Sequence, residues 1–153
     1  MPDVNHDVFV CYSSADRQQV VRIAERMRRK HLRVWLDDWE LKPGDSIIKK
    51  VKSGIQHSRF MLAIVSENSM KSHWVQHELS ASLFVEASRG SAEVIAAIVG
   101  HVGFDDLPQE LLRKHCLDMR NPSAEADSVA RVVDLVRPDL RVARELKESL
   151  RKL

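Results

Sequence analysis

Five short apolar runs, separated by segments with helical spacing, constrain the fold of this chain most. The runs are VFVCY (8–12), RVWLD (33–37), FMLAIV (60–65), VIAAIV (94–99) and CLDM (116–119). They are largely continuous rather than alternating, which is typical of strands buried on both faces. The alternation of strand and helix predicts an α/β fold: a flavodoxin-like five-stranded parallel sheet of order 2-1-3-4-5, with helices on both faces.

Apolar residues three and four positions apart predict the helices between these strands. Such stripes fall within residues 20–27, 47–55, 75–85, 108–114 and 129–136. Asp16 is expected to be the N-cap of the first helix. The last is expected to be capped by Ser123 or Ser128 and to stop at Pro138.

Length and composition describe one globular domain. The 153 residues are 44% hydrophobic and 30% charged, as in a soluble protein. The net charge of +2 is too small to imply a nucleic-acid partner. The basic residues of the first helix and its end are not interleaved with aromatic residues, so they are interpreted as a solvated face.

Cysteine usage and the absence of targeting signals predict a reducing compartment. Cys11 and Cys116 are far apart in the sequence, and we expect both to be buried, reduced thiols. The first residues, MPDVNHDV, do not resemble a secretory signal, and no apolar run is long enough to span a membrane. We therefore expect a cytoplasmic protein without a membrane partner.

The last residues predict an additional amphipathic helix. Between Asp139 and Leu153, leucines recur among alternating charges. We divide the chain into a domain at 1–137 and a C-terminal helix or linker at 138–153. Three interpretations of the apolar stripe are open: it folds back on its own domain, leads into another domain, or packs on a second copy.

A ligand of such a fold is expected at the carboxyl ends of the strands, where the loops carry hydroxyl and carboxylate groups. Glu78 lies one turn into the helix that follows the third of these loops. Trp74 lies four residues earlier and so shares its helix face. Alternatively, Glu78 is an ordinary acid in the first turns of a helix, stabilised by the helix dipole, and Trp74 closes the core.

Several site types are excluded by their motifs. The chain has no GxGxxG, no GxxxxGK[ST] and no GxSxG, which argues against a dinucleotide fingerprint, a P-loop and a hydrolase nucleophile elbow. A phosphorylatable receiver needs acidic residues where Ser13-Ser14 and Ser66 stand. His73 and His77 form an HxxxH pair without a third ligand nearby, so no metal site is predicted.

Three stretches, in order, resemble the Toll/interleukin-1 receptor (TIR) domain family, and its prokaryotic members in particular. They are DVFVCYSSAD (7–16), VWLDDWELKPGDSI (34–47) and HWVQHELSASL (73–83), with FMLAIVSENSMKS (60–72) fitting the intervening strand and turn. The resemblance covers about residues 7 to 137. Some members are adaptors that act through TIR–TIR contacts, whereas others cleave NAD+ at the nicotinamide–ribose bond. Adaptors commonly lack the glutamate that this chain has as Glu78.

The resemblance implies an NAD+ glycohydrolase or cyclase activated by self-assembly in defence signalling, with a non-enzymatic assembly module as the alternative. NAD+ is then a substrate, and no cofactor or metal is implied. The implied partners are NAD+, other TIR copies in a homo-oligomer or filament, and a fused or associated sensor domain.

The resemblance also assigns residues to roles. The catalytic residue is Glu78. Substrate-binding residues are Trp74, Tyr12, Ser13, Ser14, Asp37 and Asp38. The assembly loop contains Trp39, Pro43, Gly44 and Asp45. Related enzymes often have arginines around the position of Ser14, and Arg17 is a possible substitute. Trp39 either completes a site shared by two protomers or packs on its own domain.

Overall fold

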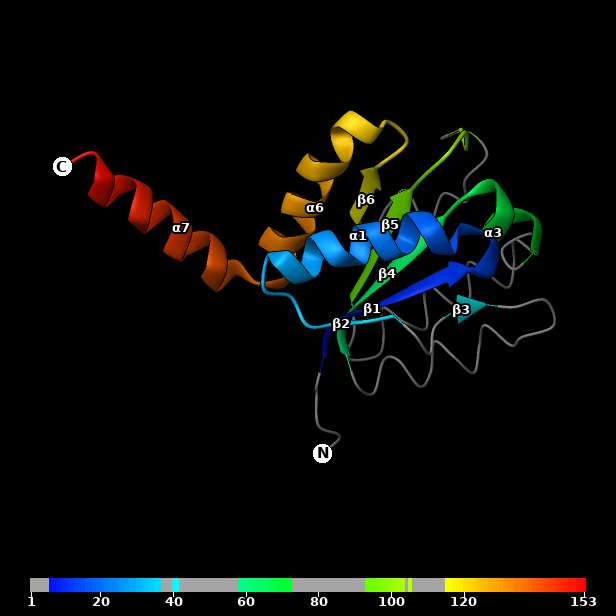
Figure 1. Cartoon of the computed structure of the whole chain (residues 1–153), viewed down its shortest axis with the longest axis horizontal. Helices are drawn as coiled ribbons and strands as arrows, with labels where there is room; N and C mark the ends of the chain where they lie inside the picture. Colours follow the sequence, from blue (N-terminus) through cyan, green and yellow to red (C-terminus); the bar gives the residue numbers. More distant parts are fainter. Residues whose placement is uncertain (1–5, 37–39, 42–57, 73–92, 104, 106–114) are drawn as a thin grey trace.

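The computed structural model describes residues 6–36, 40–41, 58–72, 93–103, 105 and 115–153 (Figure 1). Its main sheet contains β1 (His6–Ser13), β2 (Val34–Trp35), β4 (Ser58–Val65), β5 (Glu93–Ile98) and β6 (His115–Asp118). All neighbours in this sheet are parallel, in the order β2-β1-β4-β5-β6. Counted along the chain, this is the predicted order 2-1-3-4-5, which confirms the fold class.

A short additional strand, β3 (Glu40–Leu41), pairs in parallel with the end of β1. Tyr12 is in register with Glu40 and Ser13 with Leu41, whereas β2 pairs with the middle of β1. The chain segment that follows β2 therefore returns to β1 at its carboxyl end.

The side chains of β1 alternate between two buried faces. Val8, Val10 and Tyr12 belong to the main apolar cluster, together with side chains of two helices. Phe9 and Cys11 point the opposite way and are also completely buried, with no exposed surface. Burial on both faces explains why the strand reads as one continuous apolar run.

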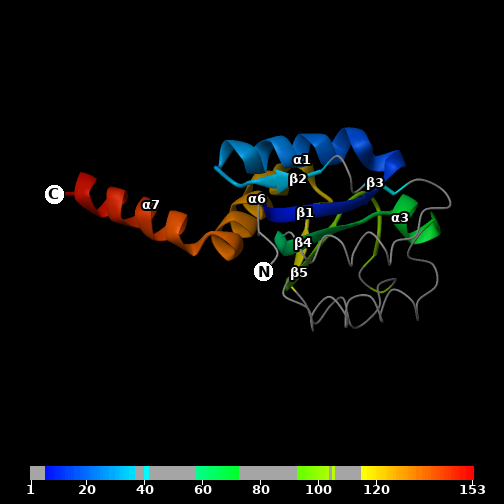
Figure 2. The same cartoon turned by 90° about the horizontal axis from the view of Figure 1, so that it is seen from below.

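The helix α1 (Arg17–Arg29) covers one face of the sheet through its predicted apolar stripe (Figure 2). It ends in a Schellman motif: the N–H of His31 donates to the Arg28 carbonyl, and the N–H of Leu32 donates to the Met27 carbonyl. His31 takes the left-handed backbone conformation that this motif requires, with a φ of 72°.

The helix α6 (Pro122–Val136) packs beside α1 on the same apolar cluster. Its N-cap is Asn121, whose side chain accepts a hydrogen bond from the N–H of Ser123, so the predicted caps Ser123 and Ser128 were wrong. Ser128 lies in the second turn and donates to the Asp118 carbonyl instead. Asn121 is a strong N-cap residue, and placing Pro122 at the first helical position agrees with proline's fixed φ.

The helix α7 (Pro138–Arg151) follows after one residue and projects away from the sheet (Figure 1). Pro138 therefore both ends α6 and begins α7.

The two described cysteines lie in strands: Cys11 is buried in β1, while Cys116 is half-buried in β6. Burial, with a smaller effect of the nearby Asp118 charge, raises the pKa of the Cys116 thiol. Among the described helices, none has the length and apolar character needed to cross a bilayer.

Candidate functional site

The candidate site lies at the carboxyl edge of the sheet, where β1 and β4 end side by side. β1 leads into a 3-10 turn, η1 (Ser14–Asp16), and then into α1. β4 leads through Ser66 into the short helix α3 (Glu67–Ser72). Since parallel strands present their carboxyl ends at one edge, these two junctions meet in space.

Asp16 connects the two junctions. One carboxylate oxygen accepts a hydrogen bond from the hydroxyl of Ser66, and the other accepts one from the side-chain amide of Asn68 at 2.8 Å. Asp16 occupies the predicted N-cap position of α1, but its side chain makes no capping hydrogen bond there. The prediction of its position was correct and the prediction of its role was wrong, because the carboxylate is used between loops.

Ser66 and Ser69 fix the start of α3 through reciprocal hydrogen bonds. The N–H of Ser69 donates to the Ser66 hydroxyl oxygen at 3.0 Å, and the N–H of Ser66 donates to the Ser69 hydroxyl oxygen at 2.8 Å. This is a capping box in which serine takes the place of the usual glutamate. Both serines are buried, at 3% and 0% exposure, so the start of α3 is held firmly beside β1.

Tyr12 is the last large side chain of β1, and it supports a cation at this edge. Its side chain is completely buried, and its hydroxyl accepts a hydrogen bond from Arg17 Nη1 at 3.1 Å. Arg17 itself is exposed at the start of α1. The tyrosine thus places a guanidinium next to the β1–α1 junction.

Ser13 and Ser14 occupy different environments. Ser13 is buried, with 4% of its surface exposed, whereas Ser14 is half-buried. Ser14 and Arg17 line an open hollow of about 490 Å³, together with Ala15, Gln18 and Val21. A hydroxyl and a guanidinium on one concave surface form a suitable environment for an anionic or sugar-bearing ligand.

The remaining predicted site residues lie outside the described residues. They are Asp37, Asp38, Trp39, Pro43, Gly44, Asp45, Trp74 and Glu78. The described chain fixes the positions on either side of them. β3 brings Glu40–Leu41 beside Tyr12 and Ser13, directly after residues 37–39. The helix α3 ends at Ser72, directly before the stretch that contains Trp74 and Glu78.

Comparison with known proteins assigns the chain to a protein family. The family model described as "TIR domain" matches residues 8–133, and the chain therefore belongs to the TIR domain family.

Several curated relatives are prokaryotic proteins named for NAD-linked activities. The chain is 35% identical over 80 residues to the 2' cyclic ADP-D-ribose synthase BtTIR of Bacteroides thetaiotaomicron, covering 52% of this chain and 28% of the relative. It is 35% identical over 75 residues to the NAD(+) hydrolase TcpA of a Theionarchaea archaeon, covering 48% and 23%. It is 33% identical over 84 residues to the NAD(+) hydrolase PdTIR of Paracoccus denitrificans, covering 54% and 28%. The matches thus span about a quarter of each relative's own length.

Solved structures agree on the fold. The TIR domain of the Toll-related receptor TRR-2 from Hydra magnipapillata aligns with a TM-score of 0.61 at 17% identity, covering 87% of this chain and 99% of the receptor domain. A TIR-STING receptor from C. gigas aligns with a TM-score of 0.63 at 19% identity, covering 87% of this chain and 40% of the receptor. A flavo di-iron protein from Thermotoga maritima aligns with a TM-score of 0.56 at 11% identity, covering 87% and 35%. At these identities the likeness shows the α/β architecture.

The connection through Asp16, Ser66 and Asn68 was not predicted from the sequence. Asp16 and Ser66 are 50 residues apart, and a carboxylate before a helix is more simply interpreted as a cap. The available signal was the pair Ser66 and Ser69, whose spacing fits a capping box and places the start of α3.

Proposed function

We propose that this chain is an NAD+ glycohydrolase or ADP-ribosyl cyclase of the TIR family, which cleaves the bond between nicotinamide and ribose. The similarity to prokaryotic relatives named as NAD(+) hydrolases and 2' cyclic ADP-D-ribose synthases carries this proposal. The presence of Trp74 and Glu78, in the spacing expected of the enzymatic branch, supports it.

The chemistry requires few groups. Cleavage passes through a transition state with positive charge at the anomeric carbon, as in other glycosidic reactions. Ordinary glycosidases also need an acid to protonate the leaving oxygen, but nicotinamide leaves NAD+ as a neutral base. One carboxylate is therefore sufficient. Glu78 accepts hydrogen bonds from ribose hydroxyls and stabilises the developing cation, while Trp74 forms an apolar wall that limits water.

The described residues fit a supporting role in this reaction. Arg17 and Ser14 line the hollow at the carboxyl edge, where we place a phosphate or a ribose hydroxyl of the substrate. Tyr12 contributes through Arg17, since its hydroxyl is already hydrogen-bonded to that guanidinium. Asp16 holds the β1–α1 junction against the start of α3, and residues 74 and 78 follow α3 closely in the chain.

We further propose that activity depends on self-assembly, with the segment that contains Trp39, Pro43, Gly44 and Asp45 contacting a neighbouring copy. A site shared by two protomers is incomplete in a monomer, so activity per protomer should rise with protein concentration. In a cell, such a device couples NAD+ consumption to a trigger that gathers the copies, as expected of a defence signal.

Nicotinamide release from NAD+ tests the proposal. Purified protein over a hundredfold range of concentration should release nicotinamide, with a rate per protomer that increases with concentration. Glu78→Ala should abolish release without changing the circular dichroism spectrum. Release by the variant at the wild-type rate would remove Glu78 from the mechanism. No release by the wild type at any concentration would contradict the enzymatic proposal and leave the assembly module.

A further inference from the structure

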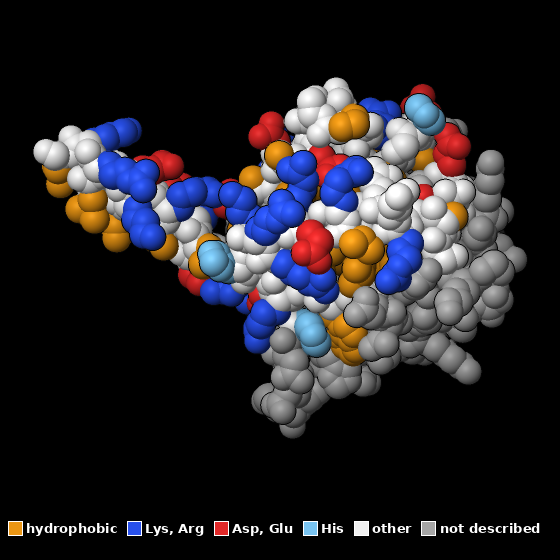
Figure 3. Space-filling view, viewed as in Figure 1, with side chains coloured by type: hydrophobic (Ala, Val, Ile, Leu, Met, Phe, Trp, Pro, Cys, Tyr) orange, Lys and Arg blue, Asp and Glu red, His pale blue; other side chains and the backbone are white. Residues whose placement is uncertain are grey.

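Helix α7 carries the exposed large hydrophobic side chains of the described residues. Val142, Leu146 and Leu150 are 61%, 60% and 58% exposed, and Leu153 beyond the helix is fully exposed. Figure 3 shows hydrophobic side chains gathered along one side of the projecting helix. Soluble proteins seldom leave such a continuous apolar stripe in water without a partner for it.

Contacts at the base of α7 fix its direction. Arg137, between α6 and α7, donates two hydrogen bonds to Asp139 at 2.9 and 2.8 Å and lies 3.8 Å from the buried carboxylate of Asp7. About two turns farther along, Arg144 pairs with Asp134 of α6 at 3.3 Å. These contacts anchor α7 to the body of the protein.

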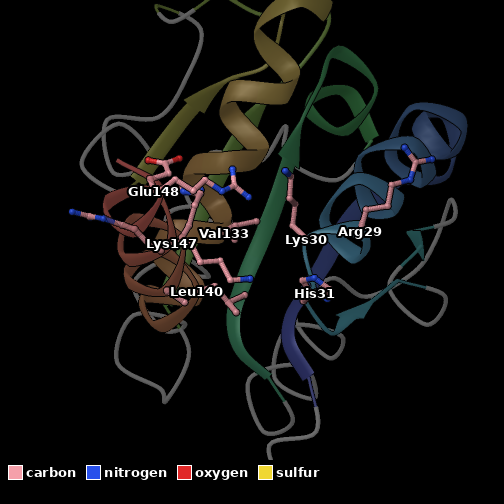
Figure 4. A pocket seen from close by; sticks show the side chains of 11 residues that line it. Arg29, Lys30, His31, Val133, Leu140, Lys147 and Glu148 are labelled. Carbon is pink, nitrogen blue, oxygen red and sulfur yellow. The ribbon is translucent and has the colours of Figure 1, made fainter. Parts of the chain in front are cut away.

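The face of α7 opposite the stripe looks toward the body. Leu140 packs against the core cluster, and Arg144 and Lys147 line a basic hollow of about 500 Å³ between α7 and the end of α1 (Figure 4). The apolar stripe is therefore turned away from its own domain. Of the three interpretations that the sequence left open, folding back onto the domain applies to Leu140 but not to the exposed stripe.

Charges flank the stripe asymmetrically. At about 100° per residue, Val142 and Leu150 lie within about 40° of Leu146, whereas Glu145 and Lys147 lie about 100° to either side. The two charged residues are only about 3 Å apart along the helix axis. Glu145 also pairs with Arg141 of its own helix at 3.1 Å, and Lys147 lies at the rim between the stripe and the hollow.

This arrangement distinguishes between the two ways of pairing α7 with a second α7. In a parallel two-fold pair, the Glu145 side of one helix faces the Lys147 side of the other, along both edges of the seam. In an antiparallel pair, Glu145 faces Glu145 and Lys147 faces Lys147. Like charges that face one another destabilise helix pairs.

We propose that α7 is a self-association surface that pairs in parallel with α7 of a second copy, burying Val142, Leu146 and Leu150 in the seam. The acidic and basic residues that flank the stripe favour a second α7 over a lipid surface as its partner. A helix that lies on an anionic membrane is rich in Lys and Arg and carries Trp or Phe on its apolar side. The α7 segment instead balances four basic residues with three acidic ones, Asp139, Glu145 and Glu148, and has no aromatic residue.

A pair of single helices buries a small seam, so the association is weak and concentration-dependent. Its consequence is proximity: two TIR domains joined through α7 experience a raised effective concentration of one another. The expectation that this raised concentration increases NAD+ cleavage rests on the proposed function, whereas the pairing itself does not.

Sedimentation of the purified protein over a hundredfold concentration range tests the pairing. The wild type should shift from monomer toward dimer. Leu146→Glu should raise the dimer dissociation constant at least tenfold, while the far-UV spectrum and melting temperature stay the same, because Leu146 is largely exposed. Arg151→Ala makes the same one-unit change in charge about 140° away and should leave the constant unchanged.

Charge reversal tests the orientation. Glu145→Lys and Lys147→Glu should each weaken self-association, and a mixture of the two variants should restore it, since opposite charges then meet on both edges. In a Cys116→Ser background, Leu150→Cys should form a disulfide-linked dimer, because Leu150 faces Leu150 in a parallel pair but Val142 in an antiparallel pair. Arg151→Cys should not form one.

Three outcomes overturn the inference: a wild type that stays monomeric, a Leu146→Glu variant that dimerises normally, or a monomer that binds phosphatidylserine vesicles through this stripe. The nicotinamide assay is read separately. A dimer that depends on Leu146 but cleaves no NAD+ contradicts only the proposed function. A monomer that cleaves NAD+ contradicts the pairing and the proposed dependence of activity on self-assembly, but not the proposed reaction.

Discussion

Replacing Asp16 with alanine removes the connection between the β1–α1 junction and the start of α3. The substitution removes the carboxylate and with it two hydrogen bonds, one from the Ser66 hydroxyl and one from the Asn68 amide. The hydroxyl of Ser66, which is only 3% exposed, then loses its carboxylate acceptor and keeps only the more distant Ser69 hydroxyl oxygen, at 3.3 Å. We therefore expect Asp16→Ala to destabilise the fold and to loosen the candidate site.

The loss of unfolding free energy depends on how deeply Asp16 and its hydrogen-bond partners are buried. A hydrogen bond to a charged group contributes about 1.5–3 kcal/mol, but this range applies to well-buried partners. Asp16 is half-buried and Asn68 is exposed, so we assign about 1 kcal/mol to each bond and a total of about 2 kcal/mol. Asp16→Asn keeps one acceptor and the side-chain shape, and should cost about 1 kcal/mol.

Urea unfolding measures the free energy of unfolding of each variant. Val132→Ala is a control of similar cost, because Val132 is completely buried in α6 and takes no part in the hydrogen bonds of Asp16, whose partners are Ser66 and Asn68. At 25 °C, with both variants folded, Asp16→Ala should reduce nicotinamide release more than Val132→Ala does. An Asp16→Ala variant whose free energy of unfolding is within about 0.5 kcal/mol of the wild type would show that the hydrogen bonds of Asp16 do not stabilise the fold.

Two further predictions concern charged contacts away from the site. Glu125, which is 2% exposed, bonds Arg22 at 2.9 and 3.1 Å and pairs with Arg26 at 3.2 Å, joining α6 to α1. Because both arginines are about half exposed, we expect Glu125→Gln to cost about 1–2 kcal/mol, seen as a lower melting temperature; an unchanged melting temperature contradicts this. Hydrogen bonds from Arg120 lower the pKa of Asp118, so this pair stabilises the fold above pH about 4, and the stability is lost as pH falls through the lowered pKa. The stability difference between wild type and Arg120→Ala should therefore narrow from pH 7 to pH 2 in urea titrations, whereas a constant difference would show that the charge pair contributes nothing.

The sheet could be predicted because its signal is local. Each strand is a continuous apolar run, and the stripes of α1 and α6 repeat at helical spacing, so element type and order followed from periodicity. The fold rules then restricted five alternating strands to a few topologies. The short strand β3 carried no such signal, since Glu40–Leu41 is defined only by its pairing with β1.

Side-chain roles were harder to predict because they depend on competing partners. Asp16 has the right position for a cap, yet the Ser66 hydroxyl and the Asn68 amide bind its carboxylate from across the site. Ser123 lies two positions after the true cap, Asn121, and the signal that separates the two is Pro122, which is suited to the first position of a helix. The local sequence predicts the position of a residue along a helix, whereas its hydrogen-bond partner depends on tertiary contacts.

The orientation of α7 was equally inaccessible. Its amphipathic pattern predicted a helix and left the destination of the apolar stripe open. The ion pairs of Arg137 and Arg144 turn the stripe outward, and these pairs depend on the angle between two helices.

The rate of nicotinamide release by Glu78→Gln tests whether the carboxylate of Glu78 is the catalytic group. Glu25→Gln is the matched control, because it makes the same chemical change at an exposed position on α1. At a protein concentration where the wild type releases nicotinamide from NAD+, we predict a loss of about 100-fold or more for Glu78→Gln and wild-type release for Glu25→Gln. A folded Glu78→Gln protein that releases nicotinamide at the wild-type rate would show that the reaction does not depend on this carboxylate.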